Sequence, residues 1–130
     1  MPATLDFVSL VSANLTFSRR FYEEGLGFPS ECFSSGPDHL KIDLENDVSL
    51  VLYERAGFEK QFGDIMGASF GGGLILTHTV PARSDVEALL ARAASAGGSI
   101  AGSPVDQDWG GYAGYVKDPD GHLWEIVSED

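Results

Sequence analysis

The feature that most constrains the fold is an order of secondary-structure elements that occurs twice along the chain. Residues 5–11 are rich in β-branched and apolar side chains and predict a strand. Residues 15–24 carry apolar side chains at helical spacing, and Asn14 or Thr16 can cap that helix. Three short strands are predicted to follow, at residues 28–34, 39–44 and 48–53. The first half therefore predicts the order β, α, β, β, β.

The second half repeats this order with different residues. A strand is predicted at 74–80, and a helix capped by Ser84 follows at 85–96 and ends at Gly97. Three strands complete the half, at residues 99–101, 112–117 and 123–128. The last two are joined by an Asp-Pro-Asp-Gly turn. A repeat of this kind predicts two modules that pack against each other and share one core and one cleft.

A chain of 130 residues fits a single domain, here predicted over residues 1–130. Module one covers about residues 3–55 and module two about residues 73–130. The connection between them, about residues 56–72, is rich in glycine and phenylalanine and has no clean hydrophobic period. We expect it to be irregular, with room for one short helical turn.

Charge and composition exclude several classes of function. Twenty acidic against eight basic residues give a net charge of −12, which would repel nucleic acid phosphates and permits a cationic ligand. No apolar run of about 18 residues is present, and the first residues lack the features of a signal peptide. The single cysteine, Cys32, suits a reducing compartment. We expect a cytoplasmic protein that binds neither nucleic acid nor a membrane.

Three segments carry a recognisable pattern, at residues 21–28 (FYEEGLGF), 86–98 and 109–125. Together they resemble the vicinal oxygen chelate superfamily, which includes glyoxalases, bleomycin resistance proteins and extradiol dioxygenases. The resemblance covers nearly the whole chain. It implies an α+β fold in which two βαβββ modules form a glyoxalase-like curved mixed sheet around a cleft, and it implies a homodimer.

The resemblance also implies where a divalent metal would bind, because enzymes of the family take two ligands from each half. In the first half these positions fall on Phe7 and Val51, which cannot coordinate a metal. In the second half the last strand supplies Glu125, and the opening strand supplies His78 or, by another count, Ile75. Catalytic metal sites usually need at least three protein ligands. We therefore expect no resident metal, with a divalent metal held by His78 and Glu125 as the alternative.

Aromatic side chains near the implied cleft indicate a small-molecule site instead. Those at or near cleft positions are Phe7, Tyr53, Trp109, Tyr112 and Tyr115. Phe58, Phe62 and Phe70 lie in the connection, where a lid would be. Such rings hold planar ligands by burial and stacking.

The leading hypothesis is a metal-free binding protein of the bleomycin-resistance type. It would sequester a hydrophobic or aromatic ligand in a ring-lined cleft with Glu125 as an acidic wall. The alternative is a glyoxalase-type lyase or isomerase that uses a divalent metal or Glu125 as a base. A third reading is an interaction module whose cleft is filled by its own rings.

Overall fold

The computed structural model describes residues 2–66 and 73–130. It contains two four-stranded sheets, one from each half of the chain. The first sheet has the order β1-β4-β3-β2, with β1 (Phe7–Ser12), β2 (Phe33–Ser35), β3 (His39–Asp43) and β4 (Ser49–Glu54). The second has the order β5-β8-β7-β6, with β5 (Leu76–Thr79), β6 (Ser99–Asp106), β7 (Tyr112–Lys117) and β8 (Leu123–Ser128).

Both sheets are mixed in the same way, which confirms the predicted α+β class and the repeated module. In each sheet the first strand of the half runs parallel to the last, and the other neighbours are antiparallel. The helices are α1 (Leu15–Arg20), which continues as the π-helical turn η1 (Phe21–Gly25), then the short 3-10 turn η2 (Ser30–Cys32), α2 (Arg55–Met66) and α3 (Arg83–Ser95).

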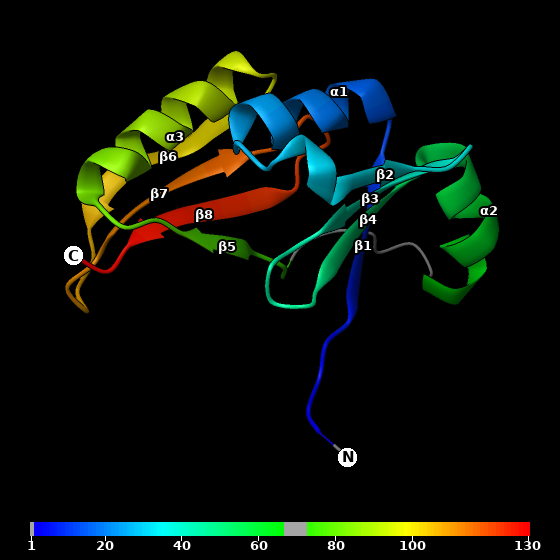
Figure 1. Cartoon of the computed structure of the whole chain (residues 1–130), viewed down its shortest axis with the longest axis horizontal. Helices are drawn as coiled ribbons and strands as arrows, with labels where there is room; N and C mark the ends of the chain where they lie inside the picture. Colours follow the sequence, from blue (N-terminus) through cyan, green and yellow to red (C-terminus); the bar gives the residue numbers. More distant parts are fainter. Residues whose placement is uncertain (1, 67–72) are drawn as a thin grey trace.

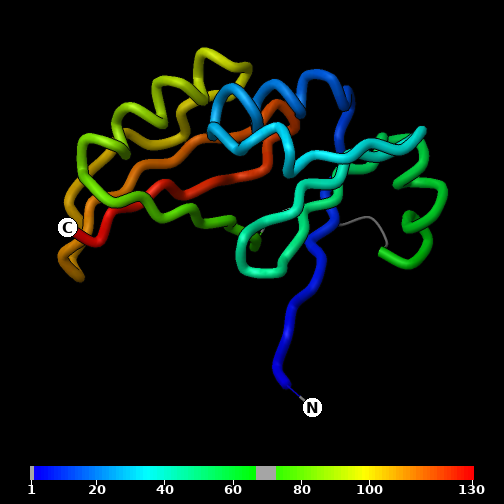
Figure 2. Tube along the Cα trace, in the orientation of Figure 1, coloured from blue at the N-terminus to red at the C-terminus, as the bar shows by residue number. Residues whose placement is uncertain are grey.

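Figure 1 shows α1 and α3 on one side of the two sheets, with α2 beside the far end of the first sheet. The trace in Figure 2 shows the two halves side by side and the N-terminal segment extending away from them. We call the side packed against α1 and α3 the helix face, and the opposite side the open face. Among the described residues, no helix is both long and apolar enough to cross a membrane.

One hydrophobic core joins the two halves. It includes Phe21 and Tyr22 from the first half and Val86, Val116 and Trp124 from the second, all at most 3% exposed. Gly98, the second glycine after α3, permits the close packing of this helix against Phe21. A Cβ atom at Gly98 would lie 2.5 Å from the Phe21 ring. Any side chain there would push the two helices apart.

A buried polar junction lies within this core. The Tyr22 hydroxyl donates to Asp118 Oδ2 over 2.6 Å, and Trp124 Nε1 donates to the Tyr22 oxygen over 3.3 Å. The other oxygen of Asp118 accepts the backbone N–H groups of Asp120 and His122. Burial raises the pKa of Asp118, although Tyr22 and His122 favour its charged form. The junction ties the first helix to the β7–β8 turn, 96 residues along the chain.

Two segments are more regular than the sequence predicts. The connection begins with α2, a twelve-residue helix rather than one short turn. The sequence pattern does not predict this helix, because it buries few side chains and therefore shows no apolar stripe. The last part of the connection, with Phe70, lies outside the described residues. Strand β6 has eight residues instead of three. It is an edge strand with irregular register around Gly102 and Val105, which lets it include Pro104.

The remaining differences are local. The expected strand at 28–34 is mainly the turn η2, and only Phe33–Ser35 pairs with β3. Helix α3 begins at Arg83, before the predicted start, with Ala82 rather than Ser84 at the N-cap. The Asp85 carboxylate accepts the N–H of Ala82 over 3.0 Å and so satisfies the helix start without a Ser84 cap. The bounds predicted for β7 and β8 are confirmed.

We expect Tyr22→Phe to lower the free energy of unfolding by about 1–3 kcal/mol, because it leaves a buried carboxylate without its hydroxyl donor. Urea denaturation measures the change. Tyr112→Phe is the matched control, since that hydroxyl bonds to Glu87 at the surface and its loss changes stability little. Equal effects of the two substitutions would contradict a structural role for the buried junction.

Candidate functional site

The register of the strands decides which side chains share the open face. In the first sheet Ser9 lies opposite Val51, and both alternate with the core residues Leu10 and Leu50. In the second sheet Thr77 and Tyr115 both lie opposite Glu125. The open face therefore brings Glu125 next to two hydroxyl-bearing neighbours from the flanking strands.

Glu125 is held by hydrogen bonds on both of its oxygens. Thr77 Oγ1 donates to Oε1 over 3.1 Å, and the Tyr115 hydroxyl donates to Oε2 over 2.9 Å. The hydrogen bond to Glu125 raises the pKa of Tyr115, so the tyrosine stays a donor. Gly102 leaves room for the Tyr115 ring, since a Cβ atom there would lie 3.1 Å from it. A carboxylate offers about four lone-pair positions, so Glu125 retains capacity for a further donor.

The structure does not bring His78 to this cluster. His78 lies opposite Ile126, a core residue, and therefore points to the helix face, where its ring lies 5.6 Å from the Phe28 ring. Burial lowers the pKa of His78. Ile75 immediately precedes β5 and is 55% exposed. Strand alternation thus separates His78 from Glu125 although both lie in neighbouring strands.

In the first half, three of the predicted ring residues do come together. The ring centroids of Tyr53 and Phe58 are 6.2 Å apart, those of Tyr53 and Phe62 are 5.9 Å apart, and those of Phe58 and Phe62 are 5.2 Å apart. Phe58 is only 6% exposed. The cluster packs α2 against β4, so part of these rings stabilises the helix and only the exposed remainder can meet a ligand.

The other predicted aromatic residues lie apart from one another. Tyr112 is opposite Ser128 on the helix face, with its hydroxyl bonded to Glu87 and the Arg83 guanidinium 4.1 Å from its ring centroid. Trp109 is 61% exposed in the loop before β7. Phe7 begins β1, is 56% exposed, and has Lys41 Nζ 5.5 Å from its ring centroid. Of these, only Phe7 shares the parity of Ser9 on the open face.

The side chains at the family positions do not fit a divalent metal within this chain. The family positions carry Phe7, Val51, Ile75 and Glu125, and only the last is a metal ligand. That is fewer than the three or four ligands which catalytic sites use. Thr77 adds a hydroxyl to the site and was not foreseen from the sequence, because nothing marks a threonine as functional until its register with β8 is known.

A second group of metal-type side chains, Asp118, Asp120 and His122, lies in the β7–β8 turn. Their ligand atoms are already used within the protein. Asp120 accepts the N–H of Ala13 and the hydroxyl of Ser18, and His122 Nε2 lies 2.7 Å from the Val11 carbonyl oxygen. These bonds fasten the turn to the first half, and they indicate a structural role.

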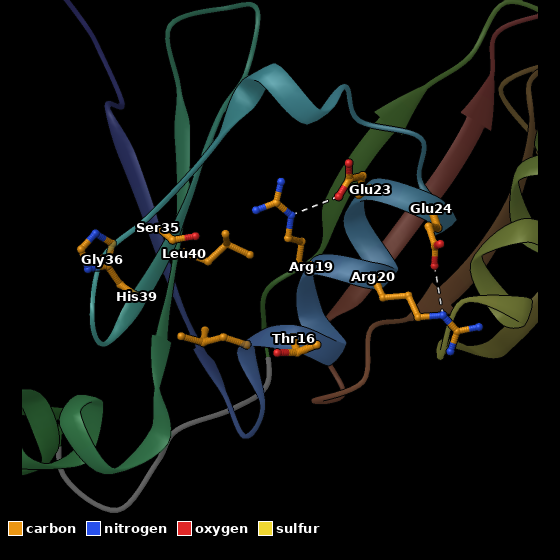
Figure 3. A pocket seen from close by; sticks show the side chains of 10 residues that line it. Thr16, Arg19, Arg20, Glu23, Glu24, Ser35, Gly36, His39 and Leu40 are labelled. Carbon is orange, nitrogen blue, oxygen red and sulfur yellow. Dashed lines mark hydrogen bonds and ion pairs between the residues drawn. The ribbon is translucent and has the colours of Figure 1, made fainter.

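An open pocket of about 680 Å³ lies between α1 and the β2–β3 hairpin. Figure 3 shows the side chains that line it. None of the sequence-predicted site residues lines it. Its charges are paired along the helix, Arg19 with Glu23 at 3.0 Å and Arg20 with Glu24 at 3.1 Å. Such surface pairs contribute little stability and leave no uncompensated charge to attract a ligand.

Comparison with known proteins gives a consistent result. The model of the Glyoxalase/Bleomycin resistance protein/Dioxygenase superfamily matches residues 4–126. A glyoxalase-related enzyme from Fulvimarina pelagi is 29% identical, with a TM-score of 0.83 over 96% of this chain and 87% of that one. A glyoxalase/bleomycin resistance protein/dioxygenase family enzyme from Burkholderia phytofirmans is 18% identical, with a TM-score of 0.84 over 98% and 100%. No curated protein matches the chain.

Because the folded state lowers the pKa of His78, the unfolded chain binds the proton more tightly. The stability that His78 contributes is complete above the pKa of the unfolded chain and is lost as the pH falls through the lower pKa of the folded state. We expect the wild type to lose more unfolding free energy than His78→Gln between about pH 7 and about pH 5. Urea denaturation at each pH tests this, and parallel losses would contradict it.

Proposed function

Because this chain belongs to the Glyoxalase/Bleomycin resistance protein/Dioxygenase superfamily, we propose that it is a metal-free small-molecule-binding protein that sequesters a hydrophobic or aromatic ligand on its open face. The observation that carries the proposal is the environment of Glu125. Among the positions where the family places metal ligands, only Glu125 carries a side chain that can bind a metal. The hydroxyl groups of Thr77 and Tyr115 hold its carboxylate in place. A single oriented carboxylate suits recognition of a ligand donor better than coordination of a metal.

Exposed apolar side chains on the open face indicate the kind of ligand. Apolar side chains at Phe7, Ile75 and Val105 are each more than half exposed, and Val105 lies opposite Ala113 on the open face. Burying such surface supplies about 25 cal/mol per Å². A ligand with an apolar or aromatic body and one hydrogen-bond donor or cationic group could contact these apolar side chains and bind the Glu125 carboxylate. The net charge of −12 favours the cationic members of this class.

We further propose that the open face is completed by a second copy of the chain. Leu5, Phe7, Leu74 and Ile75 are all more than half exposed at the starts of the edge strands β1 and β5. Exposed apolar groups at two sheet edges are typical of interfaces. A homodimer would cover them and would convert an open surface into an enclosed cleft.

We expect the wild type to sediment as a dimer and Phe7→Glu to shift the population to monomer, because a charge would then be buried at the interface. Ile65→Glu is the control, since it adds the same charge at an 81% exposed apolar side chain that belongs to α2 and not to an edge strand. Analytical ultracentrifugation gives the masses. A monomeric wild type would contradict the dimer and leave ligand binding to be judged separately.

We expect calorimetric titration with a panel of aromatic cations, anions and neutral compounds to find binders among the cations. Glu125→Gln should weaken them by about tenfold, the loss of one charge-assisted hydrogen bond of about 1.5 kcal/mol. Glu129→Gln, near the exposed C-terminus, is the matched control. Unchanged affinity in Glu125→Gln would contradict the assigned site.

Metal analysis of protein purified without chelator distinguishes the proposal from a metal-dependent lyase or isomerase. We expect far less than one equivalent of any divalent metal, because the family positions provide one carboxylate and no imidazole. A stoichiometric divalent metal would overturn the metal-free form of the proposal. It would direct attention to ligands that a second copy brings to Glu125.

A further inference from the structure

A pocket of about 530 Å³ lies between the two halves; it shares Thr77 with the Glu125 cluster, whereas Glu125 itself does not line it. Its walls come from the loop after η1, the β3–β4 turn, the edge strand β5 and Trp124. The volume falls within the range of about 300–1,000 Å³ that is typical of small-molecule sites. The sequence does not reveal this pocket, because its walls meet only when the halves pack together.

The inner wall of this inter-module pocket is aromatic. The Phe28 ring is the central element, with ring centroids 5.6 Å from His78 and 6.2 Å from Trp124, both approached edge to face. Leu26 and Leu44 add aliphatic surface. Flat ring surfaces meeting at steep angles form a slot that accommodates a planar group by stacking and edge contacts.

His78 supplies the polar contact within the slot. Its side chain is half-buried, and none of the described residues hydrogen-bonds its ring nitrogens. Burial lowers its pKa, so the imidazole is neutral near neutral pH and offers one donor and one acceptor. A half-buried imidazole without a protein partner is an available contact for a ligand.

The rim of the inter-module pocket is acidic. Asp43 and Glu45 line it, and no lysine or arginine does. Lys41 lies 3.4 Å from Asp43 and compensates that charge, whereas Glu45 forms no ion pair within the described part of the chain. A negative rim above a neutral aromatic slot attracts a cation and disfavours an anion of the same shape.

We propose that the inter-module pocket is a second binding site, for a small planar aromatic cation whose rings contact Phe28 and whose charged group faces Glu45. Glu125 does not line this pocket, although Thr77, which donates to Glu125, forms part of its wall beside His78. It does not depend on the function proposed for the open face.

Two probes of the same three-ring shape and opposite charge test the site: aminoacridine, a cation, and anthracene carboxylate, an anion. We expect aminoacridine to shift the NMR signals of the His78 ring protons in a saturable way through ring currents. The chain has three histidines, and His39 and His122 serve as internal references. The variant His78→Gln assigns the signals.

Charge selectivity is tested by calorimetry on variants of the β3–β4 turn. Glu45→Gln should weaken aminoacridine by about threefold, the size expected for one exposed ion pair. Asp47→Asn removes a charge from the same turn without touching the pocket wall, and it should leave the affinity unchanged. Anthracene carboxylate should bind the wild type more weakly than aminoacridine.

Three results would overturn the second site: no His78 shift, equal shifts at all three histidines, or equal affinity for the two probes. A His78 shift that disappears in Glu125→Gln would also overturn it and would assign the cation to the open face instead. Retention of the His78 shift in Glu125→Gln supports the second site whether or not the open face binds a ligand.

Discussion

The hydrogen bond between Tyr22 and Asp118 couples the two halves of this protein. It joins the end of the first helix to the last hairpin inside the buried core, where a polar group without a partner costs about 1–3 kcal/mol. Trp124 bonds to the same hydroxyl and packs its ring against Tyr22 and Phe28. Together with the shared core and the bonds of Asp120 and His122, this junction holds the two halves against each other.

Strand alternation then divides the second sheet into two chemically different surfaces. On the open face, Thr77 and Tyr115 orient the carboxylate of Glu125. On the helix face, His78 and Phe28 form an aromatic wall. The carboxylate of Glu125 and the imidazole of His78 therefore lie on opposite faces of the sheet, and they cannot bind the same metal ion within one chain.

Much of the fold follows from local signals in the sequence. The Asp-Pro-Asp-Gly turn sets the β7–β8 hairpin, whose predicted bounds match the structure, and Gly97 marks where α3 ends. Helix α2 is the main exception, because it rests against β4 through Tyr53 and Phe58 and needs no apolar stripe along its length. The helix propensity of that segment is weak, and its packing against β4 determines that it is helical.

The candidate site was only partly predictable for a physical reason. Glu125 is identified by the family resemblance, which places a ligand position on the last strand. The orientation of His78 depends on the register of β5 against β8, which no local pattern fixes. Thr77 becomes visible only through that register, and the inter-module pocket only through the packing of two halves. Contacts between distant segments are the part of a structure that single-sequence reasoning reaches last.

The position of His78 has a consequence for how proteins with this fold change over time. The strand beside Glu125 already contains an imidazole, that of His78, but it is one residue away from the position that faces the carboxylate. Exchanging Thr77 and His78 would turn the ring towards the carboxylate and place two metal-type groups side by side. The mutational distance between a ring-lined and a metal-lined version of this surface is therefore short. A histidine in this strand therefore does not by itself indicate whether a relative has a ring-lined or a metal-lined surface, because the face on which the histidine lies depends on its register.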